Sequence, residues 1–258
     1  MSRLIKLEKI DHCALVTIDN APANTWTKQS LTDLRDMVRE LNDDKTIYSL
    51  VLTGQGEKFF SAGADLKVFA DGDKGVASDM ARIFGEAFEA LSAFRGVSIA
   101  AINGYAMGGG LEVALACDIR IAEEQAQLAL PEAKVGLLPC AGGTQNLSWL
   151  VGEGWAKRMI LCGERIDAHK AEKIGLVEEV VGKGEAKAAA LALAIKVNEQ
   201  SPTSVAACKT LIQKGRSDDI SSALPLEREQ FVALFDTEDQ KEGVSAFLQK
   251  RQPVWVNG

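Results

Sequence analysis

The chain has 258 residues, of which 47% are hydrophobic and 25% charged, and its net charge is −7 at pH 7. This balance is typical of a globular protein and argues against disorder. The acidic charge leaves no basic footprint for nucleic acid or for an anionic membrane surface. The length suits one substantial core with an appendage, or two small domains.

Targeting and redox features of the sequence indicate an intracellular setting. The N-terminus lacks the apolar stretch of a signal peptide, and the apolar run at 188–195 is far short of a membrane span. The five cysteines are odd in number and form no Cys-x-x-Cys pair. This usage is typical of reduced thiols. We therefore expect a cytoplasmic protein that binds neither membrane nor nucleic acid.

The hydrophobic patterns predict an α/β core in the first part of the chain. In chain order, the expected elements are a β-hairpin of strands over 4–10 and 13–19, a helix over 28–42, a buried strand over 48–54, a mobile loop over 71–75, a helix over 80–94, a buried strand over 97–102, a helix over 111–117 and a strand over 119–121. Two of these segments share a plan of apolar strand, Gly- and Ala-rich turn, and helix, which is weak internal repetition.

After about residue 182 the composition changes to Ala-rich helical patterns, with breaks expected at 201–202 and 221–222. We divide the chain into an α/β core over 1–195 and a helical section over 196–258. Phe231, Leu234 and Phe235 give that section a broad apolar face. Such a face packs either on another subunit or on its own core, and the sequence leaves both open.

A run of three glycines, 108–110, lies between the strand that ends near Ile102 and the helix that continues from Leu111. The N–H groups at a helix start are unpaired and lie at the positive end of the helix dipole. Glycine also lets a ligand approach the main chain closely. The run therefore suits an oxygen that gains negative charge, although glycine clusters often mark only a tight turn.

Two glutamates follow turns of this kind. Glu112 lies in an otherwise apolar helix segment, and Glu132 follows Pro131. Burial would raise the pKa of either carboxyl group and suit it to proton transfer. For Glu112 the alternatives are a carboxylate favoured by the helix dipole or a paired charge, and for Glu132 a solvated turn residue.

The remaining polar candidates have simpler interpretations. Asp65 in the small-residue turn 61–65 is placed to cap the next helix, and Lys67 to lie on the surface. His12 and His169 fall at a hairpin turn and on a short helix. The sequence contains no Gly-x-Ser-x-Gly, His-Glu-x-x-His or Walker A motif, which disfavours hydrolase, zinc and nucleotide functions.

Taken together, five segments closely resemble the crotonase superfamily and, within it, the enoyl-CoA hydratases. They are 59–67 (FFSAGADLK), 101–112 (AINGYAMGGGLE), 130–132 (LPE), 136–145 (GLLPCAGGTQ) and 242–251 (EGVSAFLQKR). The resemblance implies a crotonase-like spiral of repeated ββα units with a C-terminal helical trimerisation region. It also implies a homotrimer, or a homohexamer built as a dimer of trimers.

The resemblance also assigns roles to residues. The N–H groups of Ala64 and Gly109 would form an oxyanion hole for a thioester oxygen, with Glu112 and Glu132 as the two catalytic glutamates. Phe247 and Lys250 match residues that reach the adenine and 3′-phosphate end of CoA, often across a subunit boundary. The other expected substrate-binding residues are Ala62, Gly63, Asp65, Leu66, Lys67 and Cys140.

The implied activity is hydration of a 2-enoyl-CoA, a reaction of fatty-acid β-oxidation, with no metal or redox cofactor because CoA is part of the substrate. The alternatives are a Δ3-Δ2 enoyl-CoA isomerase, another crotonase-type acyl-CoA enzyme, and a non-catalytic CoA-binding protein. Acyl length and branching stay open, and we expect the loop 71–75 and the following helix to shape the acyl end. Relatives commonly carry Gly where this chain has Cys140, so we expect this side chain to narrow the pocket.

Overall fold

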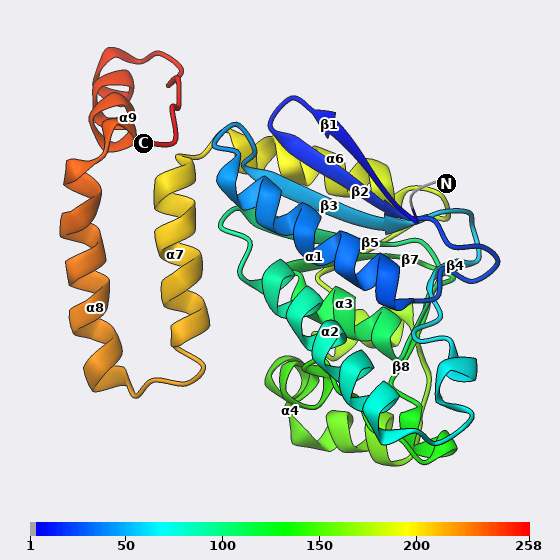
Figure 1. Ribbon diagram of the computed structural model, residues 1–258. Coiled ribbons are helices and arrows are strands. Elements are labelled where there is room, and N and C mark those ends of the chain that lie inside the picture. The colour runs from blue at the N-terminus through cyan, green and yellow to red at the C-terminus, as the bar shows by residue number, and fades with distance from the viewer. Residues whose placement is uncertain (1–3) are drawn as a thin grey trace.

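The structure is a computed structural model that describes residues 4–258. Its larger sheet has six strands in the order β1-β2-β3-β5-β7-β10 (Figure 1). The bounds are β1 Ile5–Ile10, β2 Cys13–Ile18, β3 Ser49–Gly54, β5 Val97–Ile102, β7 Ile119–Glu123 and β10 Glu179–Val181. The expected hairpin is the antiparallel β1–β2 pair, and all later pairs in this sheet are parallel.

A smaller sheet has the order β4-β6-β8-β9. Its strands are β4 Phe59–Ser61, β6 Tyr105–Met107, β8 Gln127–Ala129 and β9 Ile166–Asp167. Three consecutive segments run from a strand of the large sheet to a strand of the small sheet and then to a helix. These helices are α2 Lys74–Ser92, α3 Gly109–Ala116 and α4 Gly143–Leu161. The predicted spiral of ββα units is therefore confirmed.

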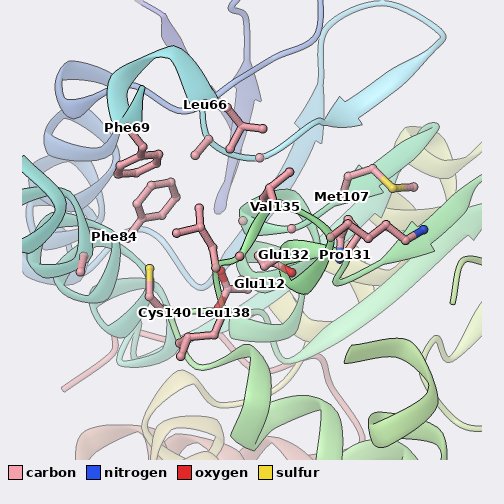
Figure 2. Close-up of a pocket in the computed structure, with 18 of the residues that line it drawn as sticks. Leu66, Phe69, Phe84, Met107, Glu112, Pro131, Glu132, Val135, Leu138 and Cys140 are labelled. Atoms are coloured by element: carbon pink, nitrogen blue, oxygen red, sulfur yellow. The ribbon is translucent and has the colours of Figure 1, made fainter. Parts of the chain in front are cut away.

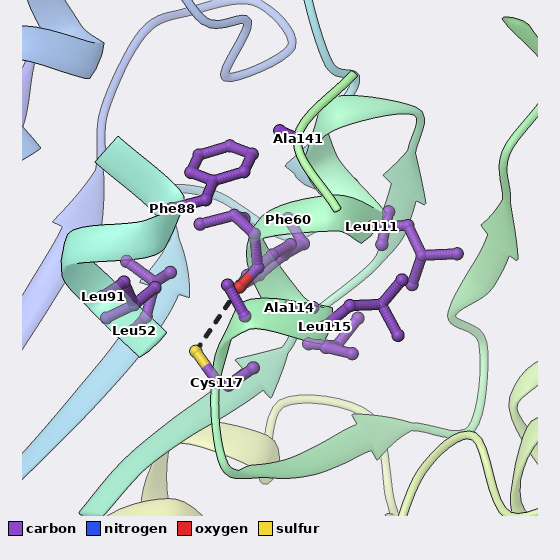
Figure 3. Close-up of a cluster of buried hydrophobic side chains, with 14 of the residues drawn as sticks. Leu52, Phe60, Phe88, Leu91, Leu111, Ala114, Leu115, Cys117 and Ala141 are labelled. Carbon is purple, nitrogen blue, oxygen red and sulfur yellow. Dashed lines mark hydrogen bonds between the residues drawn. The ribbon is translucent and has the colours of Figure 1, made fainter. Parts of the chain in front are cut away.

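Helices cover both faces of the large sheet, as expected for parallel strands with continuous apolar runs. α1 (Lys28–Asp43) and α2 lie on one face, and α6 (Ala186–Asn198) lies on the other (Figure 1). All eight residues of α3 are buried, and this helix packs against α2, α4 and the small sheet. Figure 3 shows Leu111, Ala114 and Leu115 of α3 among the apolar side chains of this core.

The C-terminal section forms α7 (Pro202–Lys214), α8 (Ile220–Ala233), the short 3₁₀ helix η3 (Leu234–Asp236) and α9 (Glu238–Gln249). α7 and α8 stand side by side, away from the two sheets (Figure 1). Lys209 ties α7 to the core by donating to the carbonyl oxygens of Phe94 at 2.5 Å and Gly96 at 3.0 Å. Phe231 on α8 remains 63% exposed, so this apolar face does not cover the chain's own core.

Some boundaries differ from the sequence prediction because of local capping. α2 begins at Lys74, since the side chain of Asp73 accepts the N–H groups of Gly75 and Val76. The break expected at 221–222 is wrong, because Asp219 caps α8 and places both serines in its first turn. The remaining elements of residues 4–258 are the helix α5 (Ala168–Lys173) and two short 3₁₀ helices, η1 (Leu66–Phe69) and η2 (Glu132–Val135). Within residues 4–258, no helix combines the length and apolarity needed to cross a bilayer.

Candidate active site

A cavity of about 680 Å³ opens between the 3₁₀ helix η1 (Leu66–Phe69), α2, the start of α3 and the 3₁₀ helix η2 (Glu132–Val135). Figure 2 shows Phe69 and Phe84 on one side of it and Met107 on the other, with Glu112 and Glu132 between them. The wall is largely apolar. The cavity therefore combines space for a hydrocarbon chain with two carboxyl groups.

Glu112 is held in the first turn of α3 and is only 2% exposed. Its Oε1 accepts the backbone N–H groups of Ala141 at 2.8 Å and Gly143 at 3.0 Å. Because Gly143 is the first residue of α4, the carboxylate also lies at the positive end of that helix. Burial raises the pKa of Glu112, and the two N–H groups oppose this rise. The hydrogen bonds fix Oε1 and leave Oε2 without a bond to a described residue.

Glu132 has a different environment on η2. Its Oε2 is buried and has no hydrogen-bond partner among residues 4–258. Burial, with a contribution from the negative charge of Glu112, raises the pKa of Glu132 to about 7. Near neutral pH, one carboxyl of the pair thus carries a proton more readily than an ordinary glutamate does.

Gly108 explains how the chain passes so close to Glu132. Its φ of 53° is in the region that favours glycine. A Cβ at this position would stand 2.9 Å from Oε1 of Glu132. A side chain at residue 108 would therefore displace the carboxyl group.

Ala64 and Gly109 line the same cavity from two segments. Neither N–H donates to another described residue. The two segments adjoin, since a Cβ on Gly63 would stand 3.1 Å from the backbone nitrogen of Gly109. Two unpaired donors on neighbouring segments suit a single oxygen that gains negative charge.

The structure brings most of the predicted site residues together. Those that line the cavity are Ala62, Gly63, Ala64, Leu66, Gly109, Glu112, Glu132 and Cys140. Asp65 and Lys67 do not line it; the Asp65 side chain instead caps η1 by accepting the Lys67 N–H at 3.1 Å. Phe247, which is 82% exposed, and Lys250 belong to the α9 region, across the molecule from the start of α3 (Figure 1).

Other parts of the cavity wall were not named from the sequence. Ala77, Ala81 and Phe84 come from α2, the helix expected to shape the acyl end. Val135 and Leu138 follow Glu132 and are 54% and 69% exposed. Two sequence signals could have identified these parts of the wall. One is the pair of small residues four positions apart on α2, Ala77 and Ala81, and the other is the apolar run after Glu132.

No group of three or more His, Cys, Asp or Glu side chains within the described residues 4–258 is arranged to hold a metal ion. His12 is exposed; its Nδ1 donates to the Thr46 carbonyl oxygen, 2.8 Å away, and its ring stacks on Tyr48. His169 is exposed on α5. The polar side chains that line the cavity are those of Glu112, Glu132, Lys134 and Cys140.

Comparisons with known proteins agree with this architecture. The sequence model of the enoyl-CoA hydratase/isomerase family matches residues 8–258. The chain therefore belongs to this family, which is the crotonase superfamily recognised from its motifs.

Three relatives illustrate the similarity. The short-chain-enoyl-CoA hydratase of Clostridium acetobutylicum is 38% identical over 247 residues, which cover 95% of each chain. The structure of Pseudomonas aeruginosa DspI is 66% identical, with a TM-score of 0.96 over 98% of this chain and 97% of that one. The enoyl-CoA hydratase structure from Bacillus anthracis is 35% identical, with a TM-score of 0.95 over 99% of this chain and 100% of that one.

Proposed function

We propose that this protein is an enoyl-CoA hydratase that adds water, with syn geometry, to a trans-2-enoyl-CoA and forms a 3-hydroxyacyl-CoA. The observation that carries the proposal is the placement of Glu112 and Glu132 in one apolar cavity with unlike environments. Family membership and the similarity to enoyl-CoA and crotonyl-CoA hydratases support an enzyme that acts on acyl-CoA.

In the proposed mechanism, Glu112 acts as the base. Its anchored carboxylate holds a water molecule through the free Oε2 and takes a proton as the oxygen bonds to carbon 3. Glu132 acts as the acid, because the pKa of about 7 lets it hold a proton for carbon 2. Both groups serve the same face of the substrate, and their roles exchange in dehydration.

The negative charge that develops on the thioester oxygen requires donors. We assign this role to the N–H groups of Ala64 and Gly109, which have no other acceptor among the described residues. Donors fixed in advance act strongly in an apolar cavity, and one such donor is typically worth about 10²–10³ in rate. The mechanism needs no cofactor beyond the CoA of the substrate.

The proposed mechanism predicts a bell-shaped pH profile. The active pair carries one proton, on Glu132 before hydration and on Glu112 before dehydration, so kcat/KM has the same pH dependence in both directions. Because the pKa of Glu132 is about 7, kcat/KM should fall about tenfold per pH unit well above that value, as the pair loses its proton. Steady-state rates from pH 5 to 9.5 would measure this limb. A constant kcat/KM across that range contradicts the assignment.

Cys140 should influence which acyl groups fit beside the water site. Cys140 is exposed at the cavity mouth, and partial desolvation with the charges of Glu112 and Glu132 raises the pKa of its thiol to about 11, so the group stays neutral and acts through its volume. Cys140→Gly should raise kcat/KM for a substrate branched at carbon 3, relative to crotonyl-CoA, by about tenfold. Cys140→Ser, which keeps the size, is the control. An unchanged substrate profile in the Gly variant would remove this role.

We also propose that the protein assembles through its C-terminal helices as a trimer, or as a hexamer of two trimers. The exposed apolar residues Phe231 and Phe235 on α8 and η3 support this assembly. In such an assembly, Phe247 and Lys250 would meet the adenine and 3′-phosphate of a CoA bound by another subunit. Neither residue lines the chain's own cavity, which supports that assignment.

The competing activity within the family is migration of a double bond from Δ3 to Δ2. That reaction needs one principal base, whereas water addition needs an acid and a base together. Parallel assays with a 2-enoyl-CoA and a 3-enoyl-CoA distinguish the two. Hydration of the first at a rate well above isomerisation of the second supports the proposal, and the reverse order overturns it.

A further inference from the structure

Trp26 contacts both segments that carry the proposed oxyanion donors, although it does not line the cavity. Its backbone N–H donates to the Gly63 carbonyl oxygen at 2.8 Å, and it forms a parallel bridge with Ala64. On the other side, its Cδ1 lies 3.5 Å from the place that a Cβ on Gly109 would occupy. One residue thus links two parts of the chain that are distant in sequence.

The residues just before Trp26 bind the same turn. Ala62 donates its backbone N–H to the Ala23 carbonyl oxygen at 3.0 Å, and the Ser61 hydroxyl donates to the Asn24 carbonyl oxygen at 2.7 Å. The Asn24 side chain donates to the Phe59 carbonyl oxygen at 2.9 Å. The segment 23–26 is therefore fastened along the whole turn that ends at Ala64.

The indole ring also belongs to a row of aromatic rings behind Gly109. Trp26 packs edge-on against Phe88, and Phe88 against Phe84, each with ring centroids 5.6 Å apart. Phe88 points from α2 into the apolar core in Figure 3, and Phe84 faces the cavity in Figure 2. Cε1 of Phe84 lies 2.9 Å from the Cβ position of Gly109. The rings fill the space next to Gly109 and limit movement of its amide.

The indole N–H does not explain why a tryptophan occupies this position. Trp26 is fully buried, and its Nε1–H has no acceptor among residues 4–258. An unpaired buried donor is unfavourable. The contribution of Trp26 must therefore come from the shape and packing of its ring and from its backbone contacts.

We propose that Trp26 is a positioning residue that holds the amides of Ala64 and Gly109 in place for the thioester oxygen. The ring acts on Gly109, and the backbone acts on the turn that carries Ala64. The proposal rests on the hydratase function proposed above. It assigns no contact between Trp26 and the substrate.

The test compares Trp26→Leu and Trp26→Phe with the wild-type protein. Trp26→Leu removes the aromatic packing, so the amide of Gly109 should shift and kcat for crotonyl-CoA should fall about 10- to 100-fold, less than the loss of a whole donor. KM should change less than threefold. Trp26→Phe keeps a ring without the N–H and should recover most of kcat.

A spectroscopic readout separates positioning from general loss of stability. Butyryl-CoA cannot be hydrated, and its bound thioester carbonyl stretch reports how strongly the two amides polarise it. The wild-type protein should shift this band to lower frequency, and Trp26→Leu should reduce the shift. Phe94→Leu is the matched control, because Phe94 is equally buried but lies beyond the C-terminal end of α2. It should lower the melting temperature without changing kcat or the band.

Each contrary result has a distinct meaning. A kcat within twofold of wild type and an unchanged band in folded Trp26→Leu overturn the proposal for Trp26. A Phe variant as impaired as the Leu variant overturns the explanation by ring packing. If the wild-type protein polarises butyryl-CoA but hydrates no enoyl-CoA, the hydratase function fails while the carbonyl band still tests Trp26.

Discussion

Glu112→Gln is expected to reduce kcat for hydration of crotonyl-CoA by about 10³-fold. The amide oxygen of glutamine can accept the N–H groups of Ala141 and Gly143, which bond to Oε1 in the wild-type protein. The fold and the cavity should therefore be kept. An amide cannot take the proton of the attacking water, so the loss should fall on kcat, and steady-state kinetics would measure it.

The control for Glu112 is a second buried glutamate outside the cavity. Glu123 is 4% exposed, and its carboxylate contacts the Gln125 side chain at 2.5 Å. Glu123→Gln should leave kcat within about threefold, since no step of the mechanism uses it. Both variants should bind butyryl-CoA with a Kd near that of the wild-type protein. Normal hydration by Glu112→Gln would exclude this residue as the base.

Glu132→Gln is expected to lower hydration by about 10²–10³-fold, because the side chain can no longer protonate carbon 2. The same change should stabilise the fold at high pH. The pKa of Glu132 is raised to about 7 from 4.5, so the folded protein binds this proton more tightly than the unfolded chain. Protonated Glu132 contributes its full share to the free energy of unfolding below its unfolded pKa of 4.5. This contribution is lost as the pH rises through the folded pKa of about 7.

The stability effect gives a readout that is independent of catalysis. At pH 8 the variant should gain about 1–2 kcal/mol in its free energy of unfolding over wild type, and near pH 4 the gain should vanish. Denaturant titrations at both pH values would measure it. A slower enzyme with no stability gain at pH 8 would mean that the Glu132 carboxyl is well solvated. A variant that hydrates at the wild-type rate would remove Glu132 as the acid.

The sequence predicted the larger strands well because their burial leaves a clear pattern. β3 and β5 are apolar runs covered on both faces, and the expected ranges 48–54 and 97–102 match Ser49–Gly54 and Val97–Ile102. The strands of the smaller sheet have two or three residues each. A segment of that length has no measurable period, so its pairing is visible only in three dimensions.

In the candidate site too, the sequence identified residues but not the packing that sets their properties. Family resemblance singled out Glu112 and Glu132, but the reason for their unlike proton affinities lies in packing. The proton affinity of Glu112 depends on its burial and on amides of the 141–143 loop, and that of Glu132 on its burial near the charge of Glu112. Trp26 gave no signal, because a buried tryptophan in a sequence does not reveal which distant backbone it touches. Contacts of this kind require the folded chain.

Incubation of the protein with crotonyl-CoA in D₂O, followed by identification of the product, tests the proposed roles of Glu112 and Glu132. We expect rapid loss of the conjugated enoyl-thioester absorbance and formation of 3-hydroxybutyryl-CoA. The product should carry one deuterium at carbon 2, added on the same face as the hydroxyl group at carbon 3. Persistence of crotonyl-CoA in the presence of protein that demonstrably binds it, or a product with the opposite relative configuration, would contradict the proposed pair of carboxyl groups.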